Sequence, residues 1–314
     1  MDRTQAFRKR LENSGFEIWF GVAFDYEKRI AVWFRYSALH RPGRPPRSAV
    51  WLSFFDQKNG TNVVRTSGFD QGIVQKGETY SVGHSSFSQN HVQGTIDDIH
   101  WNLACTHAHE AESHVPEFVM NSPLVKTKSI VVSPFCGFSG IVKIGKRELN
   151  LNASGCYTHI WGTERVPELY WCFVPQFDNT DIGMEFFAVR PKPFLPLIKF
   201  ITIREGSKLI HQHSLWRSAR ARFQSDFPEF KASGAIGNGT FDLECRMAEP
   251  ATAYIYVDPS GSNRYINQND ASYARLILGR AGQRQELISN HRAAVEFHGM
   301  KPWAGSGYIN PYEN

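Results

Sequence analysis

Glu185 and His159 are the residues of this sequence best suited to acid–base chemistry. Glu185 lies among a methionine and two phenylalanines, and a carboxyl group in such surroundings is costly to bury unless it is protonated or hydrogen-bonded. Burial also raises the pKa of a carboxyl group, so a protonated Glu185 would suit general acid catalysis near neutral pH, with His159 orienting it or accepting a proton later. A structural alternative stays open, in which the two side chains are cross-strand partners that satisfy each other inside an apolar barrel.

Aromatic side chains accompany both residues at alternate positions. Period-two counting places Tyr157, His159 and Trp161 on one face of a strand, Trp171 on the next strand and Glu185 on a third. Three successive antiparallel strands would bring these side chains together. We therefore predict an apolar cavity in which His159 and Glu185 form the functional polar pair.

The opening strands carry a second polar and aromatic set. Over residues 16–24 the even positions are apolar, while Glu17 and Trp19 occupy the other face, and Trp33 and Arg35 alternate in the same way on the next strand. These side chains point either into a cavity or to solvent, and the alternation does not distinguish the two. The predicted ligand-binding set is Trp19, Trp33, Arg35, Trp101, Tyr157, Trp161 and Trp171.

Motifs for cofactors and metals are missing or weak. The sequence has no P-loop, no GxGxxG and no GxSxG nucleophile elbow. His107, His109 and His114 could share a face of a strand around a metal ion, but they lie in a polar stretch typical of a solvated loop. We expect no metal site and no cofactor.

Short β-branched and aromatic runs, separated by Gly, Asn, Asp and Pro clusters, extend along nearly the whole chain. Helical patterns of the length that parallel α/β folds require are almost absent. The fold class is therefore all-β, and 314 residues suggest two domains. Three prolines between Val189 and Pro196 exclude a central strand there. We expect one domain over residues 1–190 and a second over residues 191–314.

Composition narrows the location and the partners. No run of about 18 apolar residues occurs, so we expect no membrane-spanning helix. The charged N-terminal 15 residues do not read as a secretory signal, and five scattered cysteines indicate reduced thiols. We expect a cytoplasmic protein that does not bind nucleic acid. A net charge of +5 is compatible with peripheral association at the inner face of a membrane. The oligomeric state stays open.

Several segments together resemble the tandem-lipocalin superfamily, which includes carotenoid hydratase (hydroxyneurosporene synthase), AttH-like proteins, tocopherol-cyclase-like proteins and certain fungal Diels-Alderases. The resemblance covers nearly the whole chain, and its most specific part is the HIWG and YWCF block at 159–173. The segments are GFEIWFGVAF at 15–24, AVWFRYSAL at 31–39, HIWGTERVPELYWCFVPQFD at 159–178, MEFFAV at 184–189, IYVDPSGSNRYIN at 255–267 and HRAAVEFHG at 291–299.

The resemblance implies two lipocalin-like (calycin) antiparallel β-barrels in tandem that bind a hydrophobic isoprenoid-like or polyketide-like molecule. It further implies a lyase or isomerase that hydrates, cyclises or isomerises its substrate by acid catalysis without a redox cofactor. His159, Trp161 and Trp171 match the family pattern, and Glu185 sits where the group tends to have an acidic residue. The alternative is a non-catalytic carrier, for which an aromatic lining alone suffices.

Overall fold

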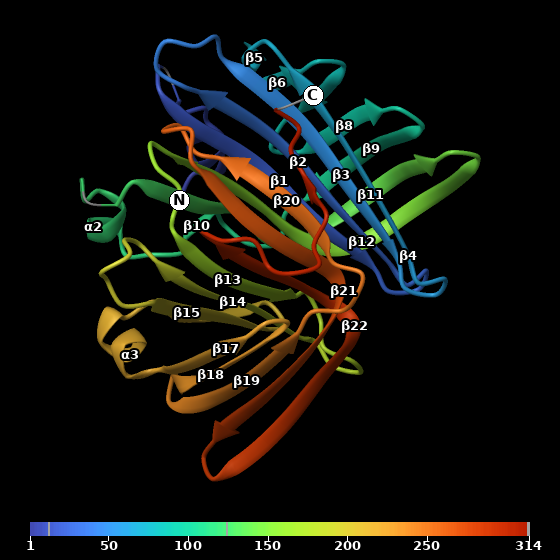
Figure 1. The fold of residues 1–314 in the computed structure, drawn as a ribbon. Helices are drawn as coiled ribbons and strands as arrows, with labels where there is room; N and C mark the ends of the chain where they lie inside the picture. The colour runs from blue at the N-terminus through green and yellow to red at the C-terminus, as the bar shows by residue number, and fades with distance from the viewer. Residues whose placement is uncertain (12, 124, 313–314) are drawn as a thin grey trace.

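The computed structural model describes residues 1–11, 13–123 and 125–312, and these fold into two curled antiparallel sheets, each a half-barrel (Figure 1). Strands make up 63% and helices 5% of the chain as the structure describes it. The predicted all-β architecture with two lipocalin-like domains in tandem is confirmed.

The first sheet is built from the N-terminal half of the chain. Its strands run in the order β4-β3-β2-β1-β12-β11-β9-β8-β7-β6-β5, and β10 pairs with β11. The strands are β1 (Gly15–Asp25), β2 (Ile30–His40), β3 (Arg47–Asp56), β4 (Thr61–Phe69), β5 (Val74–Lys76), β6 (Thr79–Val82), β7 (Ser85–Phe87), β8 (His91–Ile96), β9 (Ile99–Thr106), β10 (Glu112–Ser113), β11 (Thr127–Ile144) and β12 (Arg147–Gly162).

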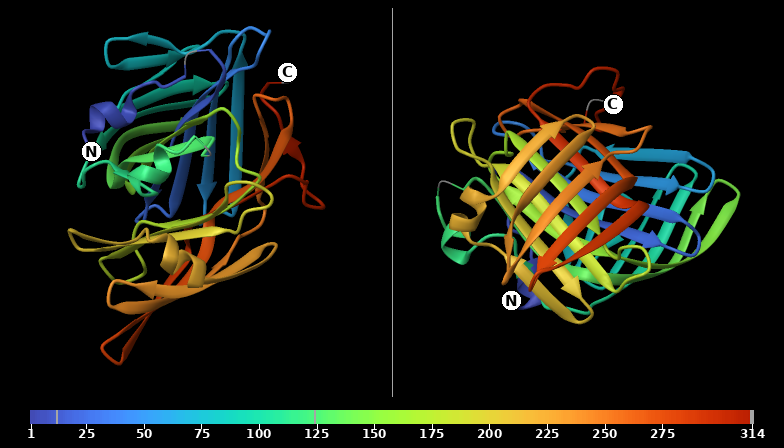
Figure 2. Two further views of the ribbon diagram at one scale, coloured as in Figure 1. Left: turned by 90° about the vertical axis from the view of Figure 1, so that its left-hand side faces the viewer. Right: turned by 90° about the horizontal axis from the view of Figure 1, so that it is seen from below.

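The second sheet follows in the C-terminal half, in the order β16-β15-β14-β13-β22-β21-β19-β18-β17, with β20 pairing β21 and β23. Figure 2 shows it as a separate curled layer against the first sheet. Its strands are β13 (Glu168–Val174), β14 (Ile182–Arg190), β15 (Ile198–Glu205), β16 (Lys208–Gln212), β17 (Arg222–Asp226), β18 (Glu229–Ile236), β19 (Gly239–Arg246), β20 (Thr252–Val257), β21 (Asn263–Arg280), β22 (Gln283–Gly299) and β23 (Tyr308–Ile309).

The described helices are short: α1 (Arg3–Phe7), α2 (Glu117–Met120) and α3 (Leu215–Arg220). Helix α1 packs against the first sheet, where Phe7 contacts the rings of Trp19 and Tyr157. Within the described residues, none of the helices has the length and hydropathy needed to cross a bilayer.

Alternation along the strands divides the apolar side chains among three cores. On β1, Trp19 and Ala23 face the interior of the first sheet, whereas Phe16, Ile18 and Val22 face the second sheet. The second sheet encloses a core of its own. The region where the two sheets pack against each other is called the seam. Strands along the seam are buried on both faces, so they carry apolar side chains on both sides. The third core, between the two sheets, is the one that positions the candidate site.

The change from one sheet to the other does not fall where the prolines suggested. The first sheet ends with β12 and the second begins with β13, so the boundary lies within residues 163–167 rather than at 190. The proline-rich segment joins β14 and β15, which pair from Val189 and Ile198 onwards. A proline-rich connection within a sheet has the same composition as a linker between domains, so local sequence did not separate the two.

Candidate functional site

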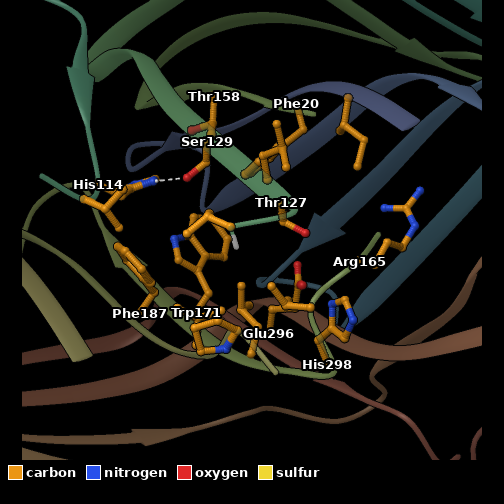
Figure 3. A pocket seen from close by; sticks show the side chains of 18 of the residues that line it. Phe20, His114, Thr127, Ser129, Thr158, Arg165, Trp171, Phe187, Glu296 and His298 are labelled. Carbon is orange, nitrogen blue, oxygen red and sulfur yellow. Dashed lines mark hydrogen bonds between the residues drawn. The ribbon is translucent and has the colours of Figure 1, made fainter. Parts of the chain in front are cut away.

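A cavity of about 170 Å³ lies between the two sheets. This is well above the ~10–15 Å³ that one ordered water requires in the same measure. Its walls are mostly apolar, and its polar groups lie in two clusters (Figure 3). The apolar lining includes Phe16, Ile18, Phe20, Val119, Met120, Ile160, Leu169, Phe187, Val189 and Ile198.

The first cluster is centred on Glu185, which β14 presents to the seam. Its Oε1 accepts a hydrogen bond of 3.0 Å from the indole Nε1 of Trp171. It also lies 3.3 Å from Nε2 of His114, an ion-pair contact. His114 Nδ1 lies 2.9 Å from the hydroxyl oxygen of Ser129 (Figure 3). Glu185 lies in the second sheet and His114 directly follows β10 of the first, so this cluster also links the two halves of the molecule.

Glu185 does not have the raised pKa expected from its apolar neighbours in sequence. Burial alone would raise the pKa of Glu185, but the charge and contact of His114, the Trp171 N–H and the more distant His213 outweigh it and lower the pKa below its usual range. Glu185 is therefore a carboxylate at neutral pH. It can accept a proton or stabilise a positive charge, but it does not suit the role of general acid.

The second cluster contains Glu296, which β22 presents to the same cavity. Burial raises the pKa of Glu296 to about 7, although the positive charges of Arg35 and Arg165 act in the opposite direction. Its neighbour His298 is buried, and burial with the charge of Arg165 and Arg264 lowers the pKa of His298 to about 3. Near neutral pH this wall thus holds a carboxylic acid that can donate a proton and an uncharged imidazole.

Trp171 connects the two clusters. It lies directly opposite Glu296 in the pairing of β13 with β22, and residues so paired share one face of the sheet. Its indole N–H is the donor to Glu185. A carboxylic acid and a carboxylate therefore lie on either side of one aromatic side chain in the cavity wall.

His159 and Glu185 do not form a pair. His159 lies inside the first sheet, where its Nε2 is 2.8 Å from Oε1 of Glu17 and its Nδ1 donates to the carbonyl of Ala6 at 2.8 Å. The prediction required β12 to pair with the strand carrying Trp171, but β12 pairs with β1 and β11. Because the chain changes sheets between β12 and β13, the odd positions of β12 and of β13 face different cores.

The predicted ligand-binding residues divide in the same way. Trp33, Arg35 and Trp171 line the cavity. Trp19, Trp101 and Tyr157 are buried in the core of the first sheet, and Trp161 packs against that core. There the side chains are already packed against one another; the rings of Trp19 and His159, for example, stack with their centres 4.5 Å apart. The first half of the chain therefore supplies only one wall of the cavity.

The cavity is also lined by four residues that were not predicted from the sequence: Glu296, His298, Arg165 and Tyr256. All four lie in the quoted segments: HRAAVEFHG carries Glu296 and His298, IYVDPSGSNRYIN carries Tyr256, and HIWGTERVPELYWCFVPQFD carries Arg165. A charged residue at the inward position of a strand otherwise rich in apolar residues was the available signal.

The histidine-rich loop has a role other than the one considered. His107 bonds to Ser133 and Asn90, at 2.7 and 2.9 Å, whereas His114 turns into the cavity. Among the residues that the structure describes, no group of three or more His, Cys, Asp or Glu is arranged to hold a metal ion.

Comparison with known proteins places the fold. No family model and no curated protein matches the chain. Among solved structures, it is similar to an AttH-like protein from Nitrosomonas europaea, with a TM-score of 0.61 at 10% identity, covering 91% of this chain and 93% of the other. It is similar to kievitone hydratase from Nectria haematococca with a TM-score of 0.55 at 10% identity, covering 92% of this chain and 90% of the other. It is similar to CghA with a TM-score of 0.61 at 12% identity, covering 93% of this chain and 89% of the other. At such identities the likeness establishes the fold alone.

Proposed function

We propose that the protein binds an isoprenoid-like or polyketide-like molecule between its two sheets and hydrates, cyclises or isomerises it by proton transfer, without a redox cofactor. The observation that carries this proposal is the pairing of Glu296, a carboxylic acid with a pKa of about 7, with the ionised Glu185 around the ring of Trp171. A kievitone hydratase among the proteins of similar fold is consistent with this chemistry.

The proton of Glu296 would pass to one carbon of a substrate C=C bond and leave a carbocation on the other. An acid with a pKa near the working pH is the most effective proton donor. The aromatic face of Trp171 and the carboxylate of Glu185 would stabilise the cation. In a hydration, water adds to the cation and Glu185, next to His114, takes the released proton. In a cyclisation, an internal double bond of the substrate replaces the water, and loss of a proton completes the reaction.

Deuterium labelling tests the reaction. Polyene and prenylated probe compounds are incubated with the protein in D₂O and analysed by mass spectrometry. Acid catalysis places deuterium on the carbon that received the proton, and the Glu296→Gln variant is the control that binds but does not turn over. Native mass spectrometry of the purified protein for a bound apolar compound narrows the choice of probes.

The second candidate function is a carrier of a hydrophobic ligand, and exposed aromatic residues near the cavity favour it. Phe118 is 71% exposed and precedes Val119, which lines the cavity. Phe194 is 84% exposed in the connection between the cavity residues Pro191 and Ile198. These segments would give access to a membrane surface. A protein that binds probes but places no deuterium in any of them is a carrier.

A further inference from the structure

Arg35 is the most unusual charged residue of the cavity wall. The side chain is 1% exposed, and Nε, Nη1 and Nη2 have no hydrogen-bond partner. The guanidinium lies over the ring of Tyr256, 3.7 Å from its centre, and 5.0 Å from that of Trp51. Aromatic rings that stack on a guanidinium contact its faces, whereas its N–H groups point outward in its plane. The hydrogen-bonding edge of Arg35 is therefore unused.

Other donors of the same wall are also unused. Arg165 donates from Nε to the carbonyl of Val257 at 3.1 Å, but its Nη2 has no partner. Trp33 Nε1 has none either. Trp33, Arg35 and Arg165 all line the cavity. Buried polar groups normally have partners, so this end of the cavity is a collection of N–H donors that lacks an acceptor.

The charges at this end do not balance. Neither Arg35 nor Arg165 forms an ion pair with any carboxylate among the described side chains. Asp258 accepts from the backbone N–H of Arg165 at 2.7 Å, and its ion-pair partner is Arg264 at 3.8 Å. Glu296 is the other acid nearby, and because its pKa is about 7 it carries only part of one negative charge at neutral pH, against the two guanidinium charges. A buried cation without a counter-ion is strongly unfavourable, so an anion that enters here would be bound tightly.

We propose that Arg35, assisted by Arg165, binds an acidic oxygen group of the substrate, a carboxylate or an enolate. This inference rests on the proposed function and defines its substrate class: an apolar body with one anionic oxygen group. Guanidinium N–H groups match the two oxygens of a carboxylate. The anionic group would lie beside Arg35, and the apolar body would extend along Phe16 and Leu169 toward Glu185.

A matched set of C12 probes tests this inference. Isothermal titration calorimetry at neutral pH compares dodecanoate, dodecan-1-ol and dodecylammonium on the wild-type protein. We expect dodecanoate to bind about tenfold or more tightly than the alcohol, and the ammonium ion to bind most weakly. Arg35→Met should remove most of the preference for dodecanoate and leave the affinity for the alcohol within about twofold. Its melting temperature should not fall, because an unpaired buried charge has been removed.

Arg44→Met removes a positive charge from an exposed loop and is the control; it should keep the preference. The wild-type comparison decides the matter even if Arg35→Met fails to fold. Equal binding of dodecanoate and dodecan-1-ol to the wild type would overturn the anionic substrate class and leave the proposed function standing. Binding of neither would remove the apolar site, and with it both proposals.

Discussion

Oε1 of Glu185 and Nε2 of His114 lie 3.3 Å apart across the seam between the two sheets. No backbone pairing joins the segments that carry them, because these segments belong to different sheets. Glu185 belongs to β14 of the second sheet, whereas His114 directly follows β10 of the first. The contact keeps Glu185 ionised inside an apolar cavity. It also makes the electrostatics of the site depend on how the two halves of the molecule dock.

Replacing Glu296 with Gln should abolish turnover and leave the binding of a neutral probe nearly unchanged, because the amide keeps the size of the side chain but has no transferable proton. The wild-type rate should fall as the pH rises through about 7, where Glu296 loses its proton. A rate that stays constant from pH 6 to 9 would contradict the role of Glu296 as the acid.

The same variant has a stability signature. Because burial raises the pKa of Glu296 from 4.5 to about 7, the folded protein holds this proton more tightly than the unfolded chain. The resulting stabilisation is complete below pH 4.5 and is lost as the pH rises through 7. The free energy of unfolding of Glu296→Gln, relative to that of the wild type, should therefore be higher at pH 8 than at pH 5 by about 1–3 kcal/mol. Urea unfolding of both proteins at the two pH values measures this difference.

Glu185→Gln should lower turnover by about 10²-fold or more, because the group that receives the proton is lost. The pKa of the Glu185 carboxyl group is lowered in the folded state. The contribution of this group to stability is therefore present above its unfolded pKa and disappears as the pH falls through its folded pKa. We expect a loss of about 1–3 kcal/mol at pH 7. A double-mutant cycle with His114→Ala measures the coupling, and additive effects would show that the contact is unimportant.

Glu17 and His159 should be structural. Glu17 accepts the backbone N–H groups of Arg10 and Leu11, at 2.5 and 3.0 Å, in addition to its contact with His159. Glu17→Gln should lower the free energy of unfolding by about 3–5 kcal/mol, as expected for a broken buried pair. Limited proteolysis should then cut residues 1–11 faster. Affinity for a neutral apolar probe, measured on the folded fraction, should not change, since neither residue lines the cavity.

Tryptophan fluorescence separates the cavity from the core of the first sheet. A bound polyene should quench the fluorescence of Trp33 and Trp171 most strongly, because both line the cavity. Trp171→Phe should remove a large part of the saturable quenching, whereas Trp101→Phe should keep it, since Trp101 is buried in the core of the first sheet. The reverse pattern would place the ligand inside the first sheet.

The exposed aromatic residues should mediate binding to anionic membranes. Helices α2 and α3 lie on the same side of the molecule (Figure 2), and Trp216 on α3 is 65% exposed beside Arg217 and Arg220. Replacing Phe118, Phe194 and Trp216 with Ser should reduce co-sedimentation with vesicles containing phosphatidylglycerol. Val74→Ser, at a 60% exposed position elsewhere, is the control. Equal sedimentation of the triple variant and the wild type would refute this surface.

The sequence by itself determined the fold class and much of the strand layout. The alternation predicted over 16–24 and over the next strand, 30–36, appears as β1 and β2, since the face on which a side chain lies follows from the backbone period of the strand alone. It also marked Glu185, Trp33, Arg35 and Trp171 as residues of interest. These signals are local, so a single segment is enough to read them.

Only the tertiary structure decided which of these residues meet. The alternation of β12 and of β13 is the same in kind, yet one strand turns His159 into the first sheet and the other turns Trp171 toward the seam. The partner of each strand is set by contacts between residues far apart in the chain, such as Trp171 with Glu296. The turn at 163–167 gives no local sign that it changes sheets. The pairing of Glu185 with His114, and the pKa values that follow from it, therefore arise only when the two sheets pack together.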